Sequence, residues 1–190
     1  MFVVFRGTMT TGEWIRDLKI RLTPCPFARI GDVHEGFSST YELVRTTVTE
    51  TLASLRGGRL YVTGHSLGAA LATLAAADIV LNTGVRAPTC YTFGSPRVGD
   101  REFAAEYNRM MPGRSFRIAN TSDMIVSVPF PVPFLGFLGG YFTHVETPVD
   151  FTAQEESSEK NHHMDTYMAA LARAKPRGLL GLAWRRGPRP

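Results

Sequence analysis

An α/β fold with a mostly parallel sheet covered by helices is predicted by two observations. Segments of strand-like composition alternate with segments of helical spacing along the sequence, with no internal repeat and no linker. The chain has 190 residues, of which 44% are hydrophobic, and this is enough to bury one substantial core. We therefore expect one α/β domain over residues 1–174, followed by a basic, flexible tail over residues 175–190.

The expected strands are short runs of β-branched, aromatic and other apolar residues. They are bounded by turn signals such as Gly57-Gly58. In chain order these runs cover residues 1–6, 28–34, 59–63, 88–93, 115–119 and 141–145. Residues 124–143 carry no charge, but the prolines and glycines in this segment predict an apolar loop rather than a membrane span.

Helices are expected between these strands. Residues 37–55 carry apolar side chains at helical spacing, and residues 69–81 are dominated by Ala and Leu. Asp100 is expected to cap a helix that ends near Met110, and a last helix is expected over residues 162–174. Because strands alternate with helices, most of the strands are expected to run parallel.

The pentapeptide Gly64-His65-Ser66-Leu67-Gly68 lies between an expected strand and an expected helix. A G-x-S-x-G pattern in this position places its serine on a sharp turn, with the positive end of the helix beside the hydroxyl. The two glycines remove side chains that would collide with neighbouring backbone. Ser66 is therefore the candidate nucleophile, although a turn serine with a purely structural role would fit the same five residues.

A serine nucleophile needs a histidine as base and a carboxylate that orients this histidine. Among the aspartates after Ser66, Asp123 directly follows an expected strand, so it is the candidate acid. His162 and His163, at the start of the last helix, are the better candidates for the base. The other histidines are expected to be structural, and His65 is expected to point elsewhere on the turn; they are His34, His65 and His144, the last on an expected strand.

Five segments follow one another in an order that is found in one protein family. They are Phe5-Arg6-Gly7-Thr8 (F-R-G-[ST]), Trp14-Ile15-Arg16-Asp17-Leu18 (W-x-x-D-L), Val33-His34-Glu35-Gly36-Phe37 (V-H-x-G-F), Gly64 to Gly68 (G-H-S-L-G) and Thr92 to Asp100 (T-F-G-x-P-R-V-G-D). Together they resemble the class 3 lipases, the α/β-hydrolase family of fungal triacylglycerol lipases and related plant phospholipases. The matches run from Val4 to Tyr167 and imply an α/β-hydrolase fold.

The resemblance also implies roles for individual residues. Ser66 would be the nucleophile, Asp123 the acid and His162 the base, because residues 162–167 are similar to the family pattern H-x-[LM]-x-x-Y. His144 would be the second, non-catalytic histidine of the family, and His163 stays as the alternative base.

For the oxyanion hole the resemblance implies Thr8, through its N–H and hydroxyl, and the Leu67 backbone N–H, with Asp17 orienting the hydroxyl. The sequence departs from the family at Val126, where proline is usual. It also has four residues before Phe5, where the family usually has a long segment. We therefore expect a sheet that lacks N-terminal elements and is short at one edge, in a minimal variant or a truncated reading frame.

The expected function is carboxyl-ester hydrolysis on acylglycerols or other lipid esters, through an acyl-enzyme intermediate. Phospholipase A1 activity and short-chain or feruloyl esterase activity are alternatives of the same class. An alternative of another class is a truncated, non-catalytic hydrolase fold that binds lipid or protein. No cofactor or metal is expected, and Cys25 and Cys90 form no metal-ligand spacing.

The resemblance implies a lipid ester as the partner, and a net charge of +4 does not by itself indicate nucleic acid binding. The basic residues of the tail 175–190, with its leucines and Trp184, would also allow transient contact with an anionic membrane or a lipid droplet. The sequence shows no signal-peptide core and no membrane span, which favours a cytoplasmic protein.

Overall fold

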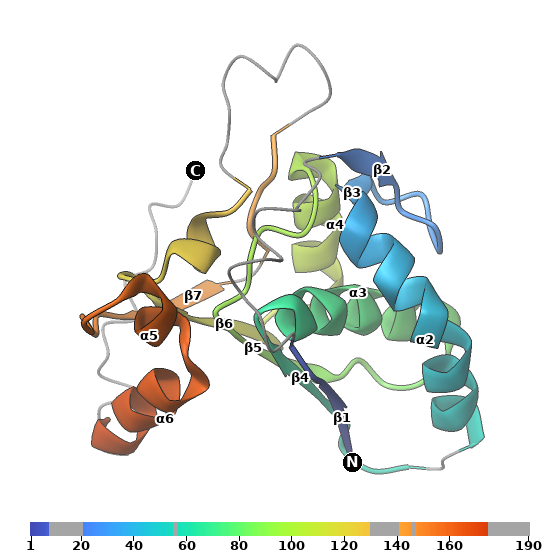
Figure 1. Cartoon of the computed structure of the whole chain (residues 1–190). Helices are drawn as coiled ribbons and strands as arrows, with labels where there is room; N and C mark the ends of the chain where they lie inside the picture. The colour runs from blue at the N-terminus through green and yellow to red at the C-terminus, as the bar shows by residue number, and fades with distance from the viewer. Residues whose placement is uncertain (8–20, 55–56, 130–140, 146, 175–190) are drawn as a thin grey trace.

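Five parallel strands form the main sheet of the computed structural model (Figure 1). The structure describes residues 1–7, 21–54, 57–129, 141–145 and 147–174. The strands of this sheet, in spatial order, are β1 (Phe2–Phe5), β4 (Tyr61–His65), β5 (Thr89–Phe93), β6 (Ser115–Asn120) and β7 (Thr147–Phe151). The predicted α/β fold with a parallel sheet is confirmed, whereas the domain bounds 1–174 and the tail 175–190 stay predictions.

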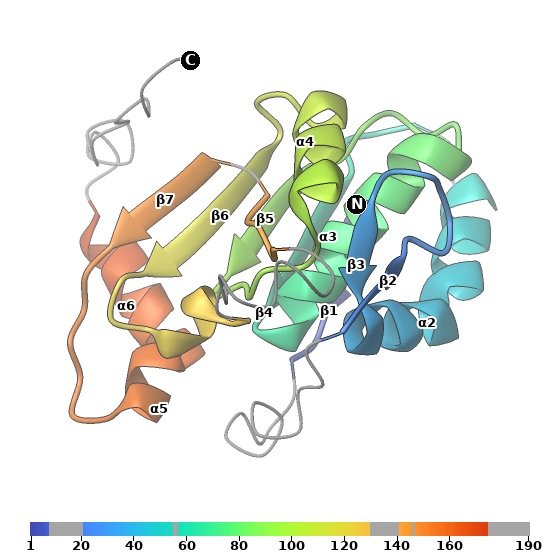
Figure 2. The same cartoon turned by 90° about the horizontal axis from the view of Figure 1, so that it is seen from above.

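Helices lie on both faces of the sheet (Figures 1 and 2). On one face are α2 (Glu35–Ser54), α3 (Leu67–Asn82) and α4 (Arg101–Met110), and on the other are α5 (Ser158–His162) and α6 (Met164–Arg173). Helix α3 packs on β1, β4 and β5, and its residues 67–79 are buried on every side. A helix that is apolar all round belongs in the interior, so α3 forms the centre of the core.

A second sheet of two antiparallel strands, β2 (Leu22–Pro24) and β3 (Asp32–His34), precedes α2. The predicted strand 28–34 is therefore shorter than expected, since the chain first turns through Gly31, whose φ is 95°. The Cys25 N–H donates to the Gly31 carbonyl across this turn, at 3.1 Å. An isolated bridge from Val33 to Gly99 joins the small sheet to the segment before α4.

One prediction near the C-terminus is wrong. Residues 141–145 do not form a strand: Thr143 makes an isolated bridge to Gly99, and the fifth strand of the main sheet is β7. This strand contains Pro148, which is tolerated because β7 is an edge strand and pairs only with β6 among the described residues. The expected last helix over residues 162–174 is present as α6, within two residues of these bounds, and His163, with ψ of 139°, is extended and separates it from α5.

No helix within the described ranges is both long enough and apolar enough to cross a lipid bilayer.

Candidate active site

Ser66 occupies the sharp turn between β4 and α3. Its backbone has φ of 59° and ψ of −126°, and no other non-glycine residue in the described ranges has a positive φ. Such a conformation costs roughly 1–3 kcal/mol and persists only where the surrounding structure holds it. Here the Ser66 N–H donates to the Phe93 carbonyl at 3.0 Å, and the Ser66 carbonyl accepts from the Ala69 and Ala70 N–H groups.

The glycines on either side of the turn allow backbone segments to approach closely. A Cβ on Gly64 would lie 2.1 Å from the Gly68 carbonyl oxygen, and a Cβ on Gly68 would lie 2.2 Å from the Phe5 carbonyl oxygen. Real Cβ atoms do not come this close to backbone, so a side chain at either position would push α3 away from β4 or β1. The motif therefore sets how closely the central helix packs on the sheet.

Asp123 and His162 are brought together from positions that are 39 residues apart. Asp123 lies beyond β6 and caps the short 3₁₀ helix η1 (Met124–Ser127), where its Oδ1 accepts the Ile125 N–H at 2.8 Å. Its Oδ2 lies 2.7 Å from Nδ1 of His162, the last residue of α5. Against a carboxylate, Nδ1 is the donor, and this leaves Nε2 of a neutral imidazole as an acceptor.

This pair lies beside the serine turn. The Ser66 N–H donates to the Phe93 carbonyl, and Gly94 is the next residue after Phe93. A Cβ on Gly94 would lie 3.0 Å from Cε1 of His162 and 3.1 Å from Oδ2 of Asp123, so Gly94 lies directly against the pair. Within the part of the chain that is described, Ser66 Oγ and His162 Nε2 are both buried and both lack a hydrogen-bond partner. A hydroxyl and an imidazole nitrogen are thus left without partners in the same region, and the two are not hydrogen-bonded to each other.

Tyr167 completes the contacts of the carboxylate, and the sequence analysis gave it no role. Its hydroxyl donates to Asp123 Oδ2 at 2.6 Å and accepts the Asn120 N–H at 3.2 Å. Burial and the nearby Asp123 charge raise the pKa of Tyr167, so this hydroxyl keeps its proton. The only sequence signal for Tyr167 was its place at the end of the H-x-[LM]-x-x-Y pattern.

Two asparagines fix the loops that carry the pair, and no signal in the sequence pointed to them. The Asn120 side chain donates to the Ala153 and Asn161 carbonyls, at 2.9 and 3.0 Å. Asn161, directly before His162, donates from its side chain to the Ser122 carbonyl, directly before Asp123, at 3.1 Å. These bonds connect the segment that holds the carboxylate to the segment that holds the imidazole.

His65 was expected to point elsewhere on the turn, but its ring lies against His162. Its Nε2 lies 2.8 Å from the His162 backbone carbonyl, and the two ring centroids are 4.5 Å apart. Burial, followed by the neighbouring His162, lowers the pKa of His65 to about 4. The ring is therefore neutral near pH 7, and Nε2 can donate to that carbonyl.

The remaining histidines are held away from the Asp123 carboxylate. His163 is exposed and lies 3.2 Å from the Asp165 carboxylate. His144 has its Nε2 2.6 Å from the Val126 carbonyl, and burial, followed by the charge of Arg117, lowers its pKa to about 3. The buried His34 accepts the Gly36 N–H at Nδ1, at 3.1 Å.

Of the residues expected to form an oxyanion hole, only Leu67 is described. It is the first residue of α3, where backbone N–H groups have no acceptor within the helix and the helix dipole is positive. Thr8 and Asp17 lie outside the described residues.

Replacing Tyr167 with phenylalanine should lower kcat for ester hydrolysis about tenfold with little change in KM, because the Asp123 carboxylate loses one charge-assisted hydrogen bond. Tyr107→Phe is the matched control, since this buried tyrosine contacts Ser115 at 2.8 Å on another part of the fold. Steady-state kinetics of both variants would check this. Equal losses of kcat in the two would contradict a role in positioning the carboxylate.

Comparison with solved structures places this fold in a known class. The lipase from Rhizopus microsporus var. chinensis superposes with a TM-score of 0.68 and 30% sequence identity, over 81% of this chain and 53% of that one. The parallel sheet with helices on both faces is thus the α/β-hydrolase fold of the fungal lipases. The model of the family "Lipase (class 3)" matches residues 2–132. The chain belongs to the class 3 lipase family.

Curated relatives are found in plants. Phospholipase A(1) DAD1, chloroplastic, of Arabidopsis thaliana is 39% identical over 149 residues, which cover 67% of this chain and 33% of the relative. Phospholipase A1-II 2 of Oryza sativa subsp. indica is 32% identical over 209 residues, which cover 90% of this chain and 51% of the relative. The chain therefore spans about half the length of these relatives or less.

Proposed function

We propose that this chain is a serine carboxyl-ester hydrolase that acts on lipid esters. The observation that carries the proposal is the buried Asp123–His162 pair, whose Nε2 has no partner among the described residues, beside a serine in a strained turn whose Oγ also has none. A buried hydroxyl and a buried imidazole nitrogen without partners are costly to the fold, and a bound ester with its reacting groups would relieve this cost.

In the proposed reaction, Ser66 Oγ attacks the ester carbonyl carbon while His162 Nε2 takes the hydroxyl proton. The tetrahedral oxyanion is bound by the Leu67 N–H and by Thr8, whose hydroxyl Asp17 orients. The bond to the alcohol breaks as His162 returns the proton to the departing oxygen. Water then attacks the acyl-enzyme with His162 again as base, releasing the carboxylic acid and restoring Ser66. Asp123 holds the imidazole in the required tautomer and stabilises the imidazolium that forms.

Acylglycerols are the first substrate we propose, since the solved structures that resemble this chain are lipases. Phospholipids cleaved at the sn-1 ester are the second candidate, because several relatives of this chain are named phospholipases A1. Short-chain and feruloyl esters remain a third, which no observation favours over the others. The rival of another class is a hydrolase fold that binds lipid or protein without catalysis.

A fluorophosphonate probe, which reacts with activated serines, tests the catalytic proposal directly. We expect labelling of the purified chain at Ser66, located by peptide mass spectrometry, and no labelling of Ser66→Ala. Ser95→Ala is the control, because Ser95 is a buried serine whose hydroxyl donates to the Pro96 carbonyl at 3.0 Å. A folded sample that does not react would favour the non-catalytic rival.

Substrate choice is tested on the same sample with a triacylglycerol, a phosphatidylcholine labelled at the sn-1 chain and a series of nitrophenyl esters of increasing chain length. We expect kcat/KM to rise with acyl length. Release of the sn-1 chain faster than hydrolysis of the triacylglycerol would assign phospholipase A1 activity instead. A preference for the shortest esters would contradict a lipid substrate.

A further inference from the structure

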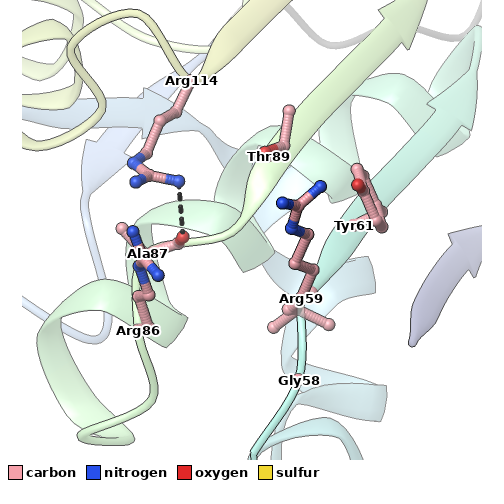
Figure 3. A pocket seen from close by; sticks show the side chains of 8 residues that line it. Gly58, Arg59, Tyr61, Arg86, Ala87, Thr89 and Arg114 are labelled. Atoms are coloured by element: carbon pink, nitrogen blue, oxygen red, sulfur yellow. Dashed lines mark hydrogen bonds between the residues drawn. The ribbon is translucent and has the colours of Figure 1, made fainter.

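A second site lies at the rim of the main sheet opposite to Ser66. A pocket of about 300 Å³ opens there, at the amino ends of β4, β5 and β6 (Figure 3). Its lining comes from three chain segments: residues 58–61, residues 86–89 without Pro88, and Arg114. Strand β4 begins at Tyr61 and ends four residues later at His65, a length of about 13 Å. The serine turn follows this carboxyl end directly, so the pocket and the turn lie at opposite ends of the strand.

Each of the three loops that enter these strands contributes one arginine. Arg59 lies shortly before β4, Arg86 lies shortly before β5, and Arg114 directly precedes β6. Because the strands are parallel neighbours, their amino ends lie side by side and bring the arginines to one place. Figure 3 shows the three guanidinium groups around the pocket, with Thr89 and Tyr61 on two neighbouring strands.

These positive charges are not neutralised by the protein that is described around them. The residues that line the pocket include no Asp or Glu, and none of the three arginines forms an ion pair with a described residue. Arg114 is half-buried, and its guanidinium donates to the Ala87 carbonyl at 3.5 Å, which restricts where it points. Three like charges gathered in this way favour an anion between them.

We propose that this pocket binds a phosphate group, either as inorganic phosphate or as the head group of a phosphorylated lipid. The planar guanidinium offers several N–H donors in the geometry that phosphate oxygens accept, so arginines from different loops can contact one tetrahedral anion together. The Thr89 and Tyr61 hydroxyls supply further donors at the pocket wall. The site is separate from Ser66 and does not depend on the proposed hydrolase activity.

Both sources of phosphate fit the surroundings. The pocket is open to small solutes through the exposed Arg59 and Arg86. It also adjoins apolar surface, because the Tyr61 ring stacks on Phe2, with centroids 5.0 Å apart, and Phe2 is 69% exposed. A lipid head group in the pocket would have its chains near these rings.

Isothermal titration of the whole chain with inorganic phosphate, at constant ionic strength set by sodium chloride, tests the site. We expect saturable binding to one site, weakened at least tenfold in Arg86→Gln and in Arg114→Gln, since each removes charge-assisted hydrogen bonds. Arg101→Gln, an exposed arginine that begins α4, is the matched control and should bind as the parent does. Ser66→Ala should also bind unchanged, which separates this site from the proposed active site.

Sedimentation with vesicles distinguishes the two sources. Phosphatidylcholine vesicles with and without phosphatidic acid differ in a phosphate monoester head group. Vesicle binding that requires phosphatidic acid and is lost in Arg86→Gln, but not in Arg101→Gln, would assign the lipid source. Saturable binding of inorganic phosphate without binding to these vesicles would assign the free anion. The proposal is overturned if neither probe binds, or if binding weakens equally in Arg101→Gln, because a general excess of positive charge would then explain it.

Discussion

Replacing His162 with alanine should lower kcat for ester hydrolysis by about 10⁴- to 10⁶-fold, the largest catalytic effect that we expect outside Ser66 itself. His162 is buried, contacts the Asp123 carboxylate at 2.7 Å and lies beside Gly94, which follows the residue whose carbonyl accepts the Ser66 N–H. Without this imidazole, no described group that is paired with a carboxylate lies beside the turn to take the hydroxyl proton. Steady-state kinetics with a nitrophenyl ester would measure the loss.

Two histidines serve as matched controls for that variant. His163→Ala removes an exposed ring whose contact is with Asp165, so kcat should stay within about twofold of the parent. His144→Ala removes a buried ring that contacts the Val126 carbonyl, and it should lower stability more than turnover. If His163→Ala or His144→Ala abolished turnover in a folded protein while His162→Ala did not, the assignment of the base would be wrong.

Replacing Arg45 with methionine should lower the free energy of unfolding by about 3 kcal/mol, because it leaves a buried carboxylate without its cation. Asp78 lies inside α3 and its side chain is fully buried. It accepts two hydrogen bonds from Arg45, at 2.8 and 3.1 Å, one from the Tyr41 hydroxyl at 2.9 Å and one from the Asn82 amide at 2.6 Å. Urea unfolding at neutral pH would measure the change.

A second substitution separates the charge from the packing of the arginine side chain. Asp78→Asn, added to Arg45→Met, removes the unpaired negative charge but keeps one amide oxygen, which can accept from either Tyr41 or Asn82, because these two donate to different oxygens of Asp78. We expect part of the lost stability to return. If the double variant is no more stable than Arg45→Met, the loss comes instead from the arginine stem and its contact with Phe27, whose ring centroid lies 5.7 Å from the guanidinium carbon.

The elements around the serine turn could be predicted because their signals are local. The run 59–63, the G-x-S-x-G motif and the Ala- and Leu-rich segment after it lie next to one another, and the structure has β4 and α3 within two residues of the expected positions. The error at 141–145 came from the same kind of reasoning. Its aromatic and β-branched residues favour a strand, whereas Pro148 counts against the true strand β7, and only its edge position in the sheet admits that proline.

Contacts between distant residues could not be predicted in the same way. The hydrogen bond of Tyr167 to Asp123 joins residues 44 apart, and the contact of His65 with the His162 carbonyl joins residues 97 apart. Neither composition nor periodicity says which way a helical tyrosine or a strand histidine will meet another segment. These contacts depend on α5 and α6 lying on the face of the sheet opposite to α3.

The parallel sheet has a consequence for how substitutions combine. Its two rims are built from different loops, which share only the strands between them: the turn at Ser66 lies at one rim and the arginine pocket at the other. Free-energy changes at sites more than about 10 Å apart without common partners usually add. A double variant with one change at each rim should therefore show the sum of its single effects. A departure from additivity would measure thermodynamic coupling carried along β4 and β5.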